Sequence, residues 1–298
     1  MYKNEYEHKY FIKNALAWKG SVTPRILLRV LVSTFYSVLI LTLYHYFPQI
    51  TFPFGPFELF GIVLGLLLVF RINAGHDRWW EARKIWGGIV NQSRNLAYDI
   101  LSYGTNITWK KETLRWVIAF PYACQETLSG EKLEPSILKK YFSERELATI
   151  YNGSHIPSYI NIQIAKQLNL GKKHGFFDGY VFLQLDKERA DLINHIGACE
   201  RILKTPMPLV YAIKLRRFIL IFLLILPFAL LEKAGNMTPF FALLVSYPLF
   251  SLDQIGVELQ NPFSYRNLSH LPLDDICQTI EKSVLLAKNR YESDDKHE

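Results

Sequence analysis

Charged residues are almost absent from two long stretches of this 298-residue chain. In residues 30–70 the only formal charge is Glu58, and in residues 218–252 the only charges are Glu232 and Lys233. Helices on the surface of a soluble domain normally keep a polar face toward water. The lack of charge therefore argues against an ordinary soluble domain and predicts two membrane-embedded stretches around a charged middle block.

The motifs of common enzyme active sites are absent as well. The chain contains no HExxH, GxSxG or GxxxxGK[ST] sequence, so these hydrolase and P-loop chemistries have no support. Two of the scattered histidines, His76 and His174, lie near charged residues, which is more often a solvated or capping position than a ligand site. None of the three cysteines has a CxxC partner, so metal spacing is absent. We expect no enzyme activity, cofactor or metal site, and buried reduced thiols at Cys124, Cys199 and Cys277.

The positive charge balance does not indicate a nucleic-acid-binding protein. The net charge is +7, but Lys and Arg gather beside the apolar stretches and not in one long patch, which is typical of membrane flanks. Residues 1–29 do not form a signal peptide, because the apolar run begins only near Val30 and no small-residue cleavage site follows it. We expect this segment to be retained on the cytoplasmic side.

Four apolar runs predict two hairpins of membrane helices. Residues 30–47 and 57–70 are separated by PQITFPFGP, whose prolines and glycine break a helix. Residues 218–231 and 237–252 are separated by the short EKAGN turn. The runs are shorter than the ~20 apolar residues of a typical span, so four core helices of a soluble protein are the alternative. The missing polar stripe favours membrane helices whose ends face protein or water.

Basic residues near these runs predict the orientation in the membrane. They precede the first run, follow the second and precede the third, whereas the two outer loops contain one basic residue, Lys233. Because cytoplasmic flanks carry the excess of Lys and Arg, we place both termini and the middle block in the cytoplasm. The predicted segments are a cytoplasmic N-terminal segment, transmembrane helices 1 and 2, a cytoplasmic helical region, transmembrane helices 3 and 4, and a cytoplasmic C-terminal segment, at residues 1–29, 30–70, 71–217, 218–252 and 253–298.

The middle block is predicted to be helical. The second apolar run passes into RWWEARKIWGGIVNQSRNLAYDIL with little punctuation, so its helix should leave the membrane and continue. Apolar residues at three- and four-residue spacing predict further helices at 112–128, 136–151, 182–203 and 273–292. No sustained period of two indicates strands. The predicted fold is an all-α membrane protein with four membrane-embedded helices and a helical cytoplasmic region.

The second apolar run contains the main candidate functional residues. Ile62, Leu66 and Phe70 recur every four residues and share one helix face. Gly61 and Gly65 lie beside them, where small residues allow helices to approach closely. Such a stripe alone is more often a packing or lipid-facing surface. If several subunits surround an axis, it would instead form stacked apolar rings that gate by dewetting.

Glu58 lies one further step of four toward the outer end of this face. In the first helical turn its carboxylate would be favoured by the helix dipole, and this explanation and a pore role are equally open. In the pore interpretation, a ring of Glu58 carboxylates lines the outer mouth and concentrates cations.

Several blocks of the sequence resemble the bestrophin family of ion channels, and its bacterial branch most closely. The first block is residues 70–97, the second is ACERILKTPMPLVY at 198–211, and the third is ELQNPF at 258–263, followed by LPLDDICQTIE at 271–281. Together with the four-run layout, they extend the resemblance over most of the chain. The signature residues are Arg78, Trp79, Trp80, Glu81, Asn261, Pro262 and Phe263.

The resemblance implies a homopentamer around one central pore in the bacterial inner membrane, with lipid around it and monovalent ions passing passively. It places a hydrophobic neck at Ile62, Leu66 and Phe70, and a second, cytoplasmic constriction at Tyr180. Bacterial members favour monovalent cations and animal members conduct anions. We therefore expect a cation such as sodium to be preferred over chloride, and an anion channel is the alternative.

The segment after the third block departs from the animal members of the family. Those members carry a run of acids that binds calcium, whereas residues 264–270 here contain no carboxylate and one arginine. Calcium needs about six to eight oxygen ligands, so we predict no calcium site.

The signature residues are expected to pack between membrane and cytoplasmic helices, with Arg78 and Glu81 in ion pairs. Two rival functions stay open. A secondary transporter finds its best support in Pro227 and Pro248, which would interrupt the third and fourth runs. A membrane-anchored scaffold would use the cytoplasmic helices as its working surface.

Overall fold

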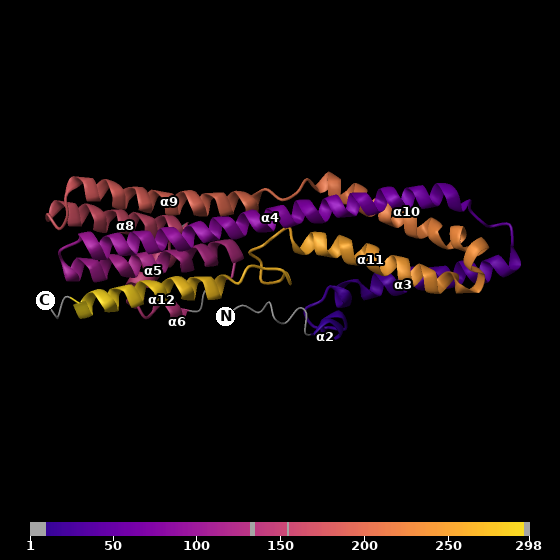
Figure 1. Ribbon diagram of the computed structural model, residues 1–298, viewed down its shortest axis with the longest axis horizontal. Coiled ribbons are helices and arrows are strands. Elements are labelled where there is room, and N and C mark those ends of the chain that lie inside the picture. Colours follow the sequence, from indigo (N-terminus) through magenta and orange to yellow (C-terminus); the bar gives the residue numbers. More distant parts are fainter. Residues whose placement is uncertain (1–9, 132–134, 154, 295–298) are drawn as a thin grey trace. The chain divides into compact units, whose positions relative to one another are not determined.

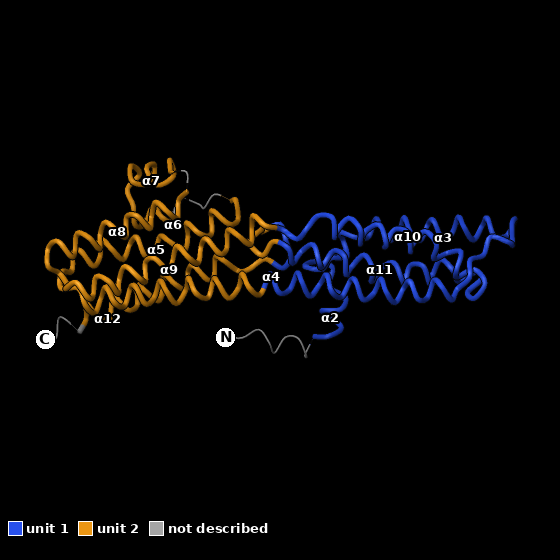
Figure 2. Tube along the Cα trace, turned by 90° about the horizontal axis from the view of Figure 1, so that it is seen from above, with its two compact units in different colours: residues 1–79, 206–260, 266–269 blue, residues 80–205, 261–265, 270–298 orange. Residues whose placement is uncertain are grey.

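The computed structural model describes residues 10–131, 135–153 and 155–294, and within these ranges every regular element is a helix. This confirms the predicted all-α fold. The chain divides into two compact units, shown in blue and orange in Figure 2. Unit 1 contains residues 1–79, 206–260 and 266–269, and unit 2 contains residues 80–205, 261–265 and 270–298.

Unit 1 is built from the apolar helices (Figure 1). The short α2 (Phe11–Ala15) precedes α3 (Thr23–Tyr46), the first half of α4 (Phe54–Tyr103), α10 (Leu209–Ala234) and α11 (Thr238–Glu258). Three helical stretches, residues 23–46, 54–103 and 209–258, are long and apolar enough to cross a membrane. A 3-10 turn at Gly235–Met237 separates α10 from α11. Each of the four predicted runs therefore lies on a helix of its own.

The membrane helices are longer than the apolar runs that predicted them. The first and third runs lie within α3 and α10, which begin earlier, at Thr23 and Leu209. This explains the short runs, because α3 carries Arg25 and Arg29, and α10 carries Lys214, Arg216 and Arg217, before the apolar run begins. The expectation that Pro227 and Pro248 interrupt the third and fourth helices is wrong, since α10 and α11 continue through them. The best support for a transporter is thereby removed.

The core of unit 1 consists almost entirely of aliphatic and aromatic side chains. α11 packs along α3, and α10 packs against both. From α4, Phe57, Leu64 and Leu68 are buried in the same cluster as Leu226 of α10. Phe57 also stacks on Phe222 of α10, with ring centroids 4.3 Å apart. These contacts fix which face of α4 is turned toward its own chain.

Unit 2 is a bundle formed by the second half of α4 and the helices of the charged middle block and the C-terminal segment. α5 packs against α8 and α12, and α8 packs against α9. All three cysteines are buried and free, as predicted. The helices besides α4 are α5 (Ile107–Ser129), α6 (Pro135–Leu138), α7 (Glu144–Tyr151), α8 (Ile156–Lys173), α9 (Gly179–Lys204) and α12 (Leu273–Asp294).

Two parts of unit 2 differ from the sequence-based prediction. The helix predicted at 136–151 is divided into α6 and α7, because Ser143 and Glu146 form a capping box that starts a new helix. Helix α8 was not predicted. It begins at Ile156, after His155, whose side chain accepts a hydrogen bond from the backbone N–H of Ser158.

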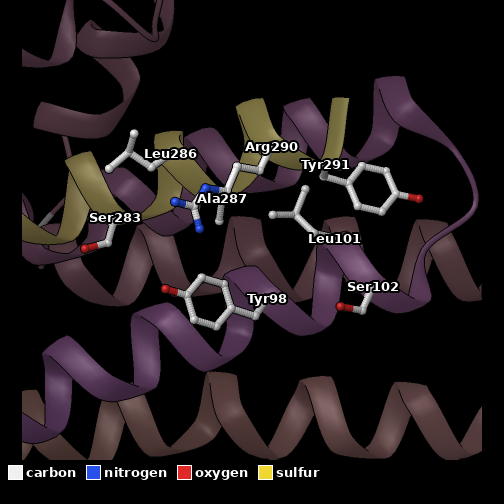
Figure 3. Close-up of a pocket in the computed structure, with 8 residues that line it drawn as sticks. All are labelled: Tyr98, Leu101, Ser102, Ser283, Leu286, Ala287, Arg290 and Tyr291. Carbon is white, nitrogen blue, oxygen red and sulfur yellow. The ribbon is translucent and has the colours of Figure 1, made fainter. Parts of the chain in front are cut away.

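A cavity of about 510 Å³ lies between α4 and α12 in unit 2. Its apolar lining is Leu101, Leu286 and Ala287. Tyr98 of α4 and Arg290 of α12 extend into the space between the two helices (Figure 3). None of the predicted site residues lines this cavity.

Candidate functional site

Helix α4 carries most of the candidate residues and is a single helix of 50 residues. Its first turn contains Pro56, which is harmless there because the first N–H groups of a helix have no intrahelical acceptor. The apolar run continues into the charged stretch without a break, as predicted. The helix stops at Tyr103, before Gly104, where an added Cβ would lie 2.5 Å from Cζ3 of Trp109.

The first half of α4 has one face that its own chain covers and another that it does not. Leu64 and Leu68 are fully buried against unit 1. On the predicted stripe, the exposed fractions are 65% for Ile62, 54% for Leu66 and 55% for Phe70. The three stripe residues therefore share a face that nothing in the described part of the chain covers.

The two glycines beside this stripe behave differently. A Cβ at Gly61 would lie 3.2 Å from the ring of Phe222, so glycine permits the close approach of α10. At Gly65 no atom lies within 4 Å of the Cβ position. The expectation that Gly65 allows close helix packing is therefore wrong within this chain, because that side of α4 faces open space.

Glu58 lies on the stripe face and is exposed. The expectation that it sits in the first helical turn is wrong, because α4 begins at Phe54 and its first turn holds no acidic residue. The field of the helix dipole falls off within the first turn. The helix dipole therefore stabilises the Glu58 carboxylate less than it would in the first turn, so the dipole alone is a weaker explanation for an acid at this position.

A buried ion pair directly follows the stripe. Nη1 of Arg71 lies 2.5 Å from Oδ1 of Asp253 on α11, and the two side chains are 1% and 4% exposed. Arg216 of α10 approaches the other oxygen of Asp253, with Nε at 3.4 Å from Oδ2. Gly256 makes room for this arrangement, since an added Cβ would lie 2.9 Å from Nε of Arg71. The pair joins three helices of unit 1 next to Phe70.

Sequence reasoning treated Arg71 only as a membrane flank and did not single out Asp253. One signal could have found them. Arg71 directly follows the second apolar run and Asp253 directly follows the fourth. Ionisable residues at such positions face protein and pair with one another.

The C-terminal end of α11 is held by a second charged contact. Glu258 is buried and pairs with Arg25 of α3. Its Oε2 accepts a hydrogen bond from the backbone N–H of Leu268 at 2.8 Å. Arg25 also donates to the carbonyl of Arg266 at 2.6 Å. Arg25 therefore ties the start of α3 to the turn after α11.

The signature residues in unit 1 bind the same turn. Nε of Arg78 donates to the carbonyl of Gln260 at 2.6 Å, and Nε1 of Trp79 donates to the carbonyl of Ser269 at 2.7 Å. Both bonds connect α4 to the segment that follows α11. An ion pair of Arg78 stays a prediction.

The signature residues in unit 2 fall into two groups. Glu81 pairs with Arg201 at 3.6 Å, as predicted, and both side chains are at least half exposed, so this ion pair contributes little to stability. Trp80 is half exposed. The second group, Asn261, Pro262 and Phe263, forms a turn.

In this turn, Oδ1 of Asn261 accepts a hydrogen bond from the N–H of Phe263 at 3.1 Å. The carbonyl of Pro262 accepts one from the N–H of Leu271 at 2.7 Å, and Phe263 is fully buried. The group thus has a structural role in fixing the start of α12. In the described residues no group of three or more His, Cys, Asp or Glu could hold a metal ion.

Tyr180 belongs to unit 2 and is the second residue of α9. The side chain of Asp178 caps this helix by accepting from the N–H of Val181 at 2.8 Å. Tyr180 is 86% exposed, so its ring is available to contact solvent or another subunit. It does not belong to the same unit as the stripe.

A second group of charges lies between α4 and α9 in unit 2. Glu188 accepts hydrogen bonds from Gln92 and, at 2.9 Å, from Gln184. Burial raises the pKa of Glu188, and the nearby Asp99 carboxylate raises it further. Burial also raises the pKa of Asp99. Burial lowers the pKa of His195, whose ring fills the space left by Gly88.

The fold and the site define an all-α membrane protein whose longest membrane helix leaves an apolar face uncovered. Residues 4–286 match the family described as Bacterial/Fungal Bestrophin protein, and the chain belongs to this family. Bestrophins are a family of membrane ion channels, not of enzymes.

Known relatives cover nearly the whole chain. A voltage-dependent anion channel-forming protein of Nostoc is 34% identical over 281 residues, which is 93% of this chain and 91% of the relative. A protein of the same description from Escherichia coli K12 is 30% identical over 286 residues, 95% of this chain and 93% of the relative. The crystal structure of a bacterial bestrophin homologue from Klebsiella pneumoniae aligns with a TM-score of 0.81 at 26% identity, covering 89% and 98% of the two chains.

Proposed function

We propose that this chain is one subunit of a homopentameric bestrophin-type channel that passes monovalent ions through a hydrophobic neck at Ile62, Leu66 and Phe70. One observation carries the proposal. The three residues are more than half exposed on one face of a membrane helix whose opposite face is fully packed.

The position of Glu58 favours a water-filled axis over lipid for this face. An exposed apolar stripe could simply contact lipid tails, but Glu58 continues the same stripe and is also exposed. A carboxylate at the centre of a membrane helix costs roughly 2.5–3.5 kcal/mol on insertion scales, and Glu58, near the start of α4, would incur part of this cost on a lipid-facing surface. A ring of subunits around water removes this cost, because it places Glu58 in the aqueous outer mouth.

The neck would act as a gate by dewetting. An ion that enters a ring of Ile62, Leu66 or Phe70 side chains gains no replacement for its water shell, so a small change in diameter changes the barrier strongly. Trimming one ring should widen the passage. Conduction is passive and requires no cofactor, and Tyr180 would form the second constriction at the cytoplasmic exit.

We assign the channel to the bacterial inner membrane, with both termini and the middle block in the cytoplasm. The support is the excess of Lys and Arg at the start of α3, in α4 after Phe70 and in the first part of α10. Its partners would be four further copies of the chain, membrane lipid and the permeating ions, with no nucleic acid.

Glu58 supports a preference for cations such as sodium, because a ring of carboxylates concentrates cations at the mouth. A second candidate function is an anion channel. It is favoured by the curated relatives, whose names describe anion channel-forming proteins.

Reversal potentials of the purified protein in planar bilayers under a salt gradient separate the two candidates. We expect a shift toward the cation Nernst potential, and a smaller shift in Glu58→Gln. The control Glu232→Gln removes an exposed carboxylate that lies outside the stripe, on α10, and should behave like the unaltered channel. A reversal at the chloride potential would overturn the cation preference and leave the anion candidate.

The neck is tested by single-channel conductance. Leu66→Ala should raise the conductance, whereas Leu244→Ala should leave it unchanged, because Leu244 is equally exposed but lies on α11 and not on α4. An equal or smaller current in Leu66→Ala contradicts the neck assignment. Saturable, proton-coupled flux would instead indicate a transporter, and absence of any flux in liposomes would indicate a scaffold.

A further inference from the structure

Unit 1 contains two adjoining cavities on its surface. The larger, about 450 Å³, lies between α3 and α10 and is almost wholly apolar. The smaller, about 190 Å³, holds charged groups. The larger cavity is lined by Leu28, Arg29, Val32, Ser33, Tyr36, Leu220, Leu223, Leu224 and Phe250. The smaller is lined by Arg29, Arg216, Ile219, Leu220, Phe250 and Asp253.

The two cavities form one continuous groove, because Arg29, Leu220 and Phe250 line both. We call it the α3–α10 groove. Two hydroxyls line its apolar end, those of Ser33 and Tyr36, and the Tyr36 hydroxyl donates to the carbonyl of Leu224 at 3.2 Å. One end therefore suits a hydrocarbon chain, and the other end offers charge.

The charged end is positive. Arg29 is exposed, and no ion pair or hydrogen bond is found for it within the described ranges. Arg216 is 52% exposed and lies 3.4 Å from Asp253. That carboxylate is already engaged by Arg71 at 2.5 Å. Two guanidinium groups, those of Arg71 and Arg216, thus contact one carboxylate, and Arg29 lines the same cavity without contacting it. Arg29 and Arg216 reach the surface.

We propose that the α3–α10 groove binds an anionic phospholipid. Its phosphate would lie between Arg29 and Arg216, and one acyl chain would run along Val32 and Leu224. Guanidinium groups bind phosphate oxygens through charge-assisted hydrogen bonds. A zwitterionic lipid would place its own cation against the two arginines, so an anionic headgroup fits better.

A second copy of the chain fits the charged end poorly. Two acids of unit 1 near this end are already engaged, Asp253 by Arg71 and Glu258 by Arg25, and Asp77 of α4 is an exposed acid. Another copy of unit 1 would therefore bring mainly Lys and Arg to the groove. The proposal does not depend on which ion the channel conducts.

The test is native mass spectrometry of the purified protein in detergent with added phosphatidylglycerol or phosphatidylcholine. Detergent removes the diffuse surface potential of a bilayer, so only a defined site retains lipid. We expect phosphatidylglycerol to bind more tightly. Because a hydrogen bond to a charged group contributes about 1.5–3 kcal/mol, Arg29→Gln and Arg216→Gln should each weaken it about tenfold or more.

Arg217→Gln is the matched control, since it removes an exposed arginine of α10 that does not line the groove. Its affinity should stay within about twofold of the unaltered protein. Val32→Trp should fill the apolar end and weaken both lipids. Equal binding of the two lipids, or an unchanged affinity in Arg29→Gln, would overturn the proposal. A changed subunit number in Val32→Trp with intact lipid binding would assign the groove to a second copy instead.

Discussion

The two halves of helix α4 differ in how far their apolar side chains are covered by the rest of the chain. In the first half, Leu64 and Leu68 are buried while Ile62, Leu66 and Phe70 are exposed. In the second half the aliphatic side chains are buried or half-buried, and Trp86, Ile89, Leu96 and Ile100 are fully buried, while the exposed aromatic surface belongs to Trp80, Tyr98 and Tyr103. The second half thus forms a core of the kind found in soluble bundles.

The difference identifies what must cover each half. The aliphatic side chains of the second half are covered by neighbouring helices of unit 2. The first half does not, and exposed apolar stripes of this kind need lipid, another subunit or a hydrophobic pore around them. The residue pattern of this one helix therefore changes along its length, from a face that needs lipid, a pore or another subunit to a face that its own unit covers.

Charges divide in the same way. Unit 1 has few acids, and two of them, Asp253 and Glu258, are buried in ion pairs. Unit 2 places many of its charges at the surface or against neutral amides, as with Glu188. Removing a charge should therefore have its largest effect in unit 1.

Asp253→Asn should cause the largest loss of stability. It leaves Arg71 buried without its counter-ion, and breaking one side of a buried ion pair costs about 3–5 kcal/mol. Thermal unfolding in detergent, followed by circular dichroism, measures the loss. The control Glu232→Gln removes an exposed acid of the same unit and should change little.

The double variant Arg71→Met with Asp253→Leu tests whether the loss of stability comes from the unpaired charge. Replacing both charges by apolar groups removes the desolvation penalty, so much of the lost stability should return. A double variant as unstable as Asp253→Asn would show that shape and not charge holds these helices together.

Two leucines on the first half of α4 provide the next comparison. Leu64→Ala creates a cavity in the core of unit 1 and should cost about 2–5 kcal/mol. Leu66→Ala removes the same atoms from an exposed position and should change the unfolding free energy by less than about 0.5 kcal/mol. Equal losses would contradict the assignment of opposite faces to these two residues.

Periodicity and charge distribution were sufficient to predict the helices of the membrane segments, the continuation of α4 beyond the apolar run and the position of α12. These features depend on local patterns. Helix starts were less predictable, because α3 and α10 begin within basic segments that an apolar run does not include.

The long-range contacts of the site could not be predicted. The pairing of Arg71 with Asp253 depends on how α4 and α11 pack, and Gly256 is needed to admit the arginine. Helix α8 was missed because its polar residues mask the apolar face that includes Ile160, Ile164 and Leu168. The stripe was found from spacing, but its exposure required the structure.

A smaller effect is expected at the break between α6 and α7 in unit 2. Ser143→Ala removes the cap of α7, which typically costs about 1 kcal/mol. Thr149→Ala, within the same helix and exposed, serves as the control and should not lower stability, because alanine is the better helix former. Ser143→Ala should therefore unfold at a lower temperature than Thr149→Ala.

The smallest expected effect is a pH dependence between α4 and α9. The pKa values of Asp99 and Glu188 are raised above 3.8 and 4.5, so the folded state holds their protons to higher pH than the unfolded state. The free energy of unfolding therefore falls as pH rises through this window. Asp99→Asn removes one titrating group and the negative charge beside Glu188. It should raise stability at neutral pH and flatten the slope.

Glu146 provides a control of opposite sign in the same unit. The hydrogen bond from Arg115 lowers its pKa from 4.5 to about 2, so its contribution is present above 4.5 and is lost as pH falls toward 2. Glu146→Gln should therefore lower stability at neutral pH, while Asp99→Asn raises it. If both variants shifted stability in the same direction, the like-charge contact between Asp99 and Glu188 would not explain the pH dependence.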